Sequence, residues 1–167
     1  MKPVNINFSE EAKALVAQAR LEAIDTGDAC ISGVHFLLAD CRLQQQPSIK
    51  QFVFADDAAF KAYYATKQAQ PPTIFKKLDR QSLPLTKAAE AMIKTAVREA
   101  KLYGSQYVEP HHLFLASCRN KDNLFTDSQD QDLDIYPRIL AYYRTLGLQL
   151  QAREGFSFVQ KIKEIFR

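Results

Sequence analysis

The stretch FSEEAKALVAQARLEAIDTGDACISGVHFLLADCR, residues 8–42, decides the fold, because it returns further along the chain. It aligns without a gap with LTKAAEAMIKTAVREAKLYGSQYVEPHHLFLASCR, residues 85–119, at a constant offset of 77 positions. Eleven of the 35 aligned positions are identical. Five of these are alanines, which any helix supplies easily, whereas the matching Gly, His, Cys and Arg are harder to obtain by chance. The chain therefore contains one motif twice.

Each copy predicts a pair of helices. In the first copy Ser9 is a good N-cap and Gly27 is a good C-terminal stop, which predicts a helix over about 9–26. Its apolar residues recur every three or four positions, as on one buried helix face. The run VHFLLADC, residues 34–41, is apolar nearly all round and predicts a central helix. The second copy repeats this pattern between Thr86 and Gly104, with Pro110 in the first turn of the next helix.

The remaining segments predict further helices. Asp56 and Asp57 are positioned to cap a helix through Tyr64, preceded by another short helix and ended by two prolines. Residues 73–81 are expected to form an ordered crossing linker, and residues 120–132 a polar loop. A helix is expected from Pro137 to Gly147, and a last one over 156–166. Since no segment alternates convincingly with a period of two, the fold class is predicted as all-α with about eight helices.

Composition restricts the functional classes. With 167 residues, 47% of them hydrophobic and 25% charged, the chain is long enough for one globular domain with a real core. The net charge of +3 is mild and no long run of like charge occurs, which disfavours a nucleic-acid partner. No stretch resembles a secretory signal or a membrane span. The odd number of cysteines favours a reducing compartment, so a cytoplasmic location without membrane binding is expected.

Motifs for catalysis, cofactors or metals are missing from the sequence. There is no phosphate loop, no glycine-rich dinucleotide turn and no zinc-ligand spacing, so no catalytic residue, cofactor or metal site is assigned. His35 and His112 recur at the same helix start. We interpret them as structural, each donating a ring N–H to a nearby backbone carbonyl and pinning the preceding turn. The alternative is a small helical enzyme that uses His111 and His112 with Glu109 or Cys118.

The repeated residues resemble the double Clp-N motif, the N-terminal domain of Clp/Hsp100 unfoldases. The resemblance rests on a capped helix, a Glu-Ala pair, a glycine-ended turn, and an Ile or Val followed four residues later by His and a Leu-rich helix. The corresponding residues are Glu22, Ala23, Gly27, Ile31 and His35–Leu38 in copy one, and Glu99, Ala100, Gly104, Val108 and His112–Leu115 in copy two.

The resemblance implies one double Clp-N domain over residues 1–167, built from two pseudo-twofold-related four-helix repeats. Repeat one would cover about 8–72, a linker about 73–82, and repeat two about 83–167. Such domains bind protein without catalysis and dock substrates or adaptors for an attached AAA+ ATPase. The expected partner is therefore an unfolded substrate, an adaptor or a Clp-type ATPase.

Two alternatives stay open within this resemblance. One is a ClpV-like unfoldase of type VI secretion, whose N-terminal domain grips a helix of a sheath subunit. The other concerns completeness. The closing amphipathic segment KIKEIFR and the absence of a Gly/Ser-rich tether favour a free-standing, adaptor-like Clp-N protein over a fragment of a larger unfoldase.

One departure from the family affects ligand recognition. In the ClpC branch, a Glu directly before the helix-start His of each copy helps to bind phosphoarginine, because a carboxylate accepts guanidinium N–H groups. This chain has Val34 and His111 at those positions. Neither provides that anion, so no phosphoarginine recognition of the ClpC kind is expected.

Overall fold

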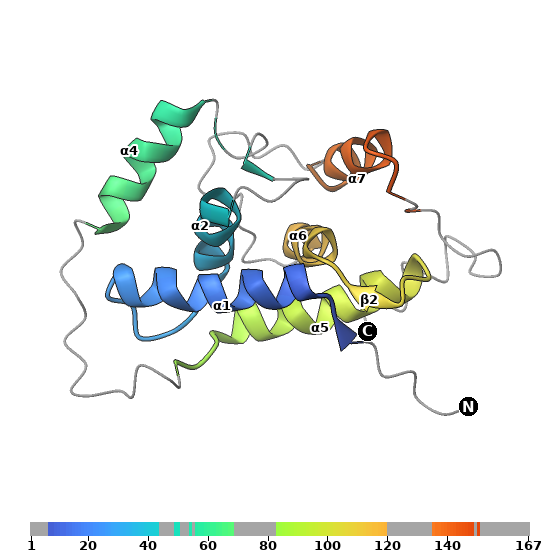
Figure 1. The fold of residues 1–167 in the computed structure, drawn as a ribbon, viewed down its shortest axis with the longest axis horizontal. Helices are drawn as coiled ribbons and strands as arrows, with labels where there is room; N and C mark the ends of the chain where they lie inside the picture. Colours follow the sequence, from blue (N-terminus) through green and yellow to red (C-terminus); the bar gives the residue numbers. More distant parts are fainter. Residues whose placement is uncertain are drawn as a thin grey trace.

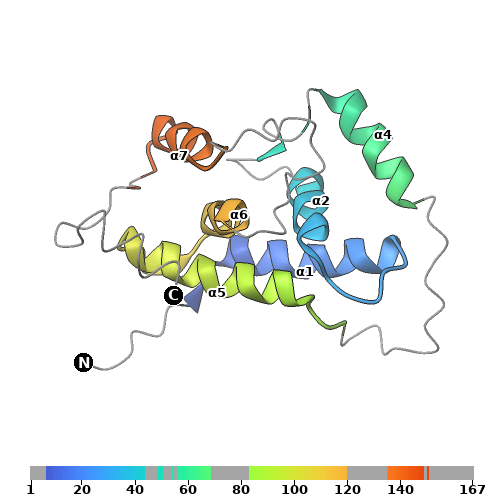
Figure 2. The same ribbon diagram turned by 180° about the vertical axis from the view of Figure 1, so that it is seen from behind.

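The computed structural model describes residues 7–43, 49–50, 54, 56–68, 83–119, 135–148 and 150. In Figure 1, α1 and α5 form the lower tier, α2 and α6 the middle tier, and α4 and α7 the upper tier; Figure 2 shows the same arrangement from behind. In chain order the elements are β1 (Asn7–Phe8), α1 (Glu10–Asp25), α2 (Gly33–Leu43), α4 (Asp57–Gln68), α5 (Lys87–Leu102), β2 (Tyr107–Val108), α6 (Pro110–Arg119) and α7 (Ile135–Thr145).

The first helices of the two copies, α1 and α5, begin and end at matching positions. The side chain of Ser9 accepts a hydrogen bond from Ala12 N, and that of Thr86 accepts one from Ala89 N, both at 3.1 Å. Gly27 and Gly104 have φ angles of 75° and 69°, the left-handed conformation in which glycine ends a helix without strain. α1 and α5 thus keep the offset of 77 residues from cap to cap, which confirms these predicted boundaries.

Two features of the predicted secondary structure need correction. α7 begins at Ile135, ahead of the predicted start at Pro137. Proline fits here because N–H groups of a first turn have no partner within the helix. In addition, two short parallel strands occur, pairing Asn7 with Tyr107 and Phe8 with Val108. Strands of two residues are too short to leave an alternating pattern, so the sequence did not predict them.

The strand pairing is reciprocal between the copies. Phe8 of copy one pairs with Val108 of copy two, and the residues at the equivalent positions, Leu85 and Ile31, form the second parallel bridge. Backbone hydrogen bonds repeat the relation: Ser9 N donates to Val108 O at 3.0 Å, and Thr86 N donates to Ile31 O at 2.9 Å. Each copy therefore supplies a segment that the other copy needs, as expected for pseudo-twofold-related halves.

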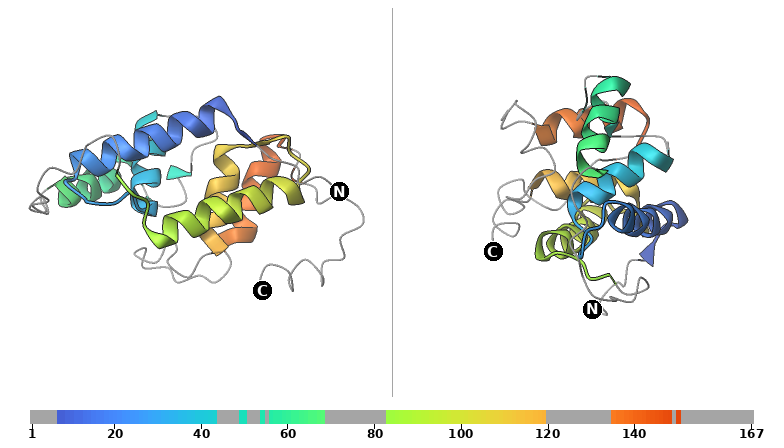
Figure 3. Two further views of the ribbon diagram at one scale, coloured as in Figure 1. Left: turned by 90° about the horizontal axis from the view of Figure 1, so that it is seen from below. Right: turned by 90° about the vertical axis from the view of Figure 1, so that its left-hand side faces the viewer.

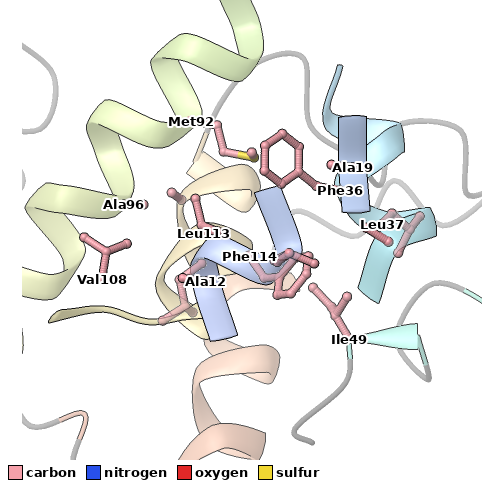
Figure 4. Packing of buried hydrophobic residues seen from close by; sticks show 14 of the residues in the cluster. Ala12, Ala19, Phe36, Leu37, Ile49, Met92, Ala96, Val108, Leu113 and Phe114 are labelled. Carbon is pink, nitrogen blue, oxygen red and sulfur yellow. The ribbon is translucent and has the colours of Figure 1, made fainter. Parts of the chain in front are cut away.

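The core lies between the tiers and is shared by both copies. α1 contacts α6 and α2 contacts α5, in addition to the contacts within each helix pair. Three alanines in each of α1 and α5 are buried and allow close helix packing, while larger residues of the middle helices fill the space between them. These alanines are Ala12, Ala19 and Ala23 of α1 and Ala89, Ala96 and Ala100 of α5. Figure 4 shows this cluster, with Ala12, Ala19, Phe36, Leu37, Ile49, Met92, Ala96, Val108, Leu113 and Phe114 labelled.

The mainly helical fold class is confirmed, with six helices in the described part of the chain. The predicted linker over 73–82, the loop over 120–132, the helix over 156–166 and most of the short helix before Asp56 lie outside the described residues. The division into repeats at about 8–72 and 83–167 stays a prediction.

Candidate functional site

The helix-start histidines occupy equivalent positions in α2 and α6. The Nδ1 atom of His35 accepts a hydrogen bond from Ser32 N at 2.9 Å, and Nδ1 of His112 accepts one from Glu109 N at 2.9 Å. The direction is opposite to the predicted one, in which the ring donates to a carbonyl. The reason is that the start of a helix exposes unpaired N–H groups, which need acceptors. Each ring acts like the Glu or Gln of a capping box.

The second ring nitrogen has different surroundings in the two copies. Nε2 of His35 lies 2.9 Å from a carboxylate oxygen of Asp28 and 3.2 Å from the hydroxyl of Thr26. Copy two has Ser105 and Tyr103 at those positions. Nε2 of His112 is buried and has no hydrogen-bond partner among the residues described. The two helix starts thus have the same hydrogen bond at Nδ1 of the histidine and differ in the partners of Nε2.

The residues before these histidines also differ. Val34 is half-buried. His111 is buried, with its ring centroid 4.1 Å from that of His112 and 5.6 Å from that of Tyr143. Burial lowers the pKa of His111 to about 4 and, together with the charge of His111, that of His112 to about 3. Both histidine rings are neutral at pH 7. Neither Val34 nor His111 therefore places a carboxylate or another charge before the helix-start histidine.

Each copy also contains a buried glutamate that pairs with an arginine and accepts a hydrogen bond from a tyrosine. In copy one, Arg42 Nε lies 2.6 Å from Glu22, whose carboxylate also accepts a hydrogen bond from Tyr64 at 3.1 Å. In copy two, Arg119 Nε lies 2.5 Å from Glu99, which accepts one from Tyr136 at 2.9 Å. The sequence analysis did not predict these clusters.

The sequence contains part of the evidence for these clusters. Glu22, Arg42, Glu99 and Arg119 are all among the identical positions of the internal repeat. A Glu in the middle of an otherwise apolar helix face, repeated together with an Arg, indicates a buried pair. The tyrosines could not be found this way, because they come from α4 and α7, outside the aligned stretch.

The residues of the rival enzyme do not assemble into a catalytic arrangement within the described part of the chain. His111 and His112 are adjacent, but Cys118 donates its thiol proton to Phe114 O at 3.2 Å. Burial raises the pKa of Cys118 to about 12, and likewise that of Cys41, so neither forms a reactive thiolate at pH 7. Glu109 contacts His112 through its backbone N–H.

The described residues contain no group of three or more His, Cys, Asp or Glu side chains arranged to hold a metal ion. None of the helices described is long and apolar enough to cross a membrane.

Comparison with known proteins identifies the repeat. Residues 62–128 match the Clp repeat (R) N-terminal domain family, a range that includes α5, α6 and part of α4. The match covers the second copy of the motif, so this part of the chain is similar to a Clp repeat. Its fold is similar to the N-terminal domain of the caseinolytic protease associated chaperone ClpD from Arabidopsis thaliana. That comparison has a TM-score of 0.53 and 17% identity, and covers 86% of this chain and 92% of the other. A comparison with curated protein sequences returned no match.

Proposed function

We propose that this protein is a Clp-N-type, non-catalytic binding module that docks polypeptide substrates or adaptors for a Clp-type unfoldase. The observation that carries the proposal is the Clp-N family match, supported by a fold similar to the N-terminal domain of a Clp chaperone. The neutral, buried histidines and the protonated thiols support binding rather than catalysis, because neither group is poised for proton transfer or nucleophilic attack at pH 7.

Binding of a permanently unfolded polypeptide tests the proposal. Reduced, carboxymethylated α-lactalbumin serves as the unfolded probe, and native α-lactalbumin serves as the folded control. We expect saturable binding of the unfolded probe by fluorescence anisotropy and no binding of the folded control. Failure to bind the probe, together with failure to bind a purified Clp-type ATPase, would refute the proposal.

A variant of His112 tests the non-catalytic part. His112→Asn is expected to lower the free energy of unfolding by about 1 to 3 kcal/mol, because a buried hydrogen bond is disturbed. Thermal and urea denaturation measure this change. If the variant instead lost a measurable turnover while its stability stayed unchanged, the helical-enzyme alternative would replace the binding module.

We further propose that this module does not recognise phosphoarginine in the manner of ClpC. Val34 is apolar and half-buried, and His111 is buried and neutral at pH 7, so neither position offers a carboxylate to a guanidinium group. Isothermal calorimetry with free phosphoarginine is expected to give no saturable heat. Saturable binding at two sites per chain would contradict this proposal. A double variant, Val34→Glu and His111→Glu, tests whether the missing carboxylates are the reason.

A further inference from the structure

The outer face of α5 carries a row of basic side chains. Four exposed cationic residues form it: Lys87, Lys94, Arg98 and Lys101. The last three follow Lys87 by seven, eleven and fourteen positions. With 3.6 residues per turn, these spacings place them on one stripe of the helix surface. The buried residues of α5, which include Met92 and Ala96, lie on the opposite side. We call these four residues the α5 basic stripe.

Within the described part of the chain, the α5 basic stripe has no counter-charge bound to it. None of its side chains forms an ion pair or a hydrogen bond with another described residue, although other surface lysines do: Lys13 pairs with Glu10, and Lys50 with Asp57. One acidic residue, Glu90, lies beside the stripe and is itself exposed. The stripe is therefore open for ions or groups supplied from outside.

The first copy gives an internal control for this surface. α1 has the same length as α5, with its cap and buried residues at equivalent positions, so its equivalent outer positions have the same geometry. They are occupied by Glu10, Ala17, Leu21 and Ile24. Neither the packing of the helix nor its N-terminal cap requires basic residues there. In the view of Figure 3 from below, α1 and α5 lie in front of the other helices, so the two helices form one side of the molecule.

We propose that the α5 basic stripe binds an acidic helical segment of a partner protein. This inference rests on the proposed protein-binding function and names the chemistry of one partner. The stripe spans about 21 Å along α5, the length of four helical turns. A helix with carboxylates at the same spacing matches it charge for charge. Complementary charges of this kind speed association and select the partner more than they raise affinity.

The observations favour an acidic protein over a nucleic acid. The stripe is a single row on one helix, in a chain whose net charge is only +3. The exposed residue within it, Ala91, is not aromatic, so the stripe offers no platform on which bases stack. We therefore do not propose nucleic-acid binding, and the experiment below includes a DNA duplex to test for it.

A labelled helical peptide of about 15 residues, with Glu at the matching spacing, is the probe. The same peptide with Gln in place of Glu is its control. We expect saturable binding of the Glu peptide by fluorescence anisotropy, weakened by salt, and at least about tenfold weaker binding of the Gln peptide. Equal affinity for both peptides would overturn the proposal.

Charge reversal locates the site. Lys94→Glu with Arg98→Glu is expected to weaken binding of the Glu peptide by at least about tenfold. The matched control, Lys13→Glu with Lys61→Glu, alters the net charge equally at exposed positions of α1 and α4 and is expected to change affinity by less than about twofold. Equal losses of affinity in both double variants would mean a general charge effect and would refute binding of the Glu peptide at the stripe. Circular dichroism melting curves check that both variants fold.

Two comparisons separate the possible failures. If a DNA duplex of similar length binds more tightly than the Glu peptide, and Lys94→Glu with Arg98→Glu abolishes that binding, the stripe is a nucleic-acid surface and the proposal is wrong. The unfolded lactalbumin probe provides the second comparison. Binding of that probe without binding of the Glu peptide refutes the proposed role of the stripe alone. If neither the probe nor the Glu peptide binds, and a purified Clp-type ATPase does not bind either, the proposed function is refuted as well.

Discussion

The two copies of the motif share their backbone and differ in what surrounds their polar side chains. In both, a histidine accepts the same backbone hydrogen bond and a buried glutamate holds an arginine. In copy one the arginine, Arg42, is 49% exposed, while Arg119 of copy two is 23% exposed. The repeated residues thus maintain the fold, and the differences around them determine how each half responds to mutation and pH.

The glutamates provide the largest expected contrast. Glu99→Ala leaves Arg119 partly buried without its counter-charge and removes the acceptor of Tyr136, so we expect a loss of about 3 to 5 kcal/mol. Glu22→Ala leaves an arginine that reaches water more easily, so the loss should be smaller, about 1 to 3 kcal/mol. Urea denaturation measures both. Equal losses would mean that exposure of the arginine does not matter.

The pKa of Glu99 reflects the cost of burying its carboxylate. Burial raises it above the usual value, while the charge of Arg119 and the hydrogen bond from Tyr136 act in the opposite direction. Replacing both Glu99 and Arg119, by Leu and Met, is therefore expected to recover much of the stability that Glu99→Ala loses, because no charge stays buried alone.

The contrast between the copies also explains what the sequence could predict. Caps and stops are local, so Ser9, Gly27, Thr86 and Gly104 were sufficient to place α1 and α5. The pairing of β1 with β2 depends on residues about 100 positions apart, such as Phe8 and Val108, and no local pattern encodes such a contact.

The candidate site was predictable in position but not in its interactions. The internal repeat located both histidines, but the direction of their hydrogen bonds follows from the geometry of the helix start. The unpaired nitrogen of His112 follows from the replacement of Asp28 and Thr26 by Ser105 and Tyr103. The position of the α5 basic stripe follows from the predicted buried face of the helix, but the lack of ion pairs within it among the described residues could be seen only in the structure.

Acid sensitivity is the second expected contrast. The unfolded chain protonates His111 and His112 near pH 6.5, whereas the folded chain holds their pKa values at about 4 and about 3. Between pH 6.5 and 3 the unfolded state therefore binds more protons, so the free energy of unfolding decreases as the pH falls through this window. Each histidine contributes up to about 1.4 kcal/mol per pH unit.

Exchanging the residue before the histidine between the copies tests this. His111→Val gives copy two the residue of copy one and is expected to make the decrease in stability between pH 6.5 and 3 shallower. Val34→His is the reciprocal variant and should steepen it only slightly, since position 34 is half-buried. Urea denaturation at a series of pH values measures the slopes. An unchanged slope in His111→Val would assign the acid sensitivity to other groups.

The helix starts provide the smallest expected contrast. Gln reproduces the acceptor of a capping box, so His112→Gln keeps the bond from Glu109 N and should cost about 1 kcal/mol or less. His35→Gln keeps the bond from Ser32 N but loses the ring contact with Asp28, which is 46% exposed, so its extra cost should be only about 0.5 to 1 kcal/mol. Leu at either position has no acceptor and should cost about 1 kcal/mol more than Gln. Denaturation curves of the four variants measure these differences, and equal stability of the Gln and Leu variants would mean that the histidines act by packing alone.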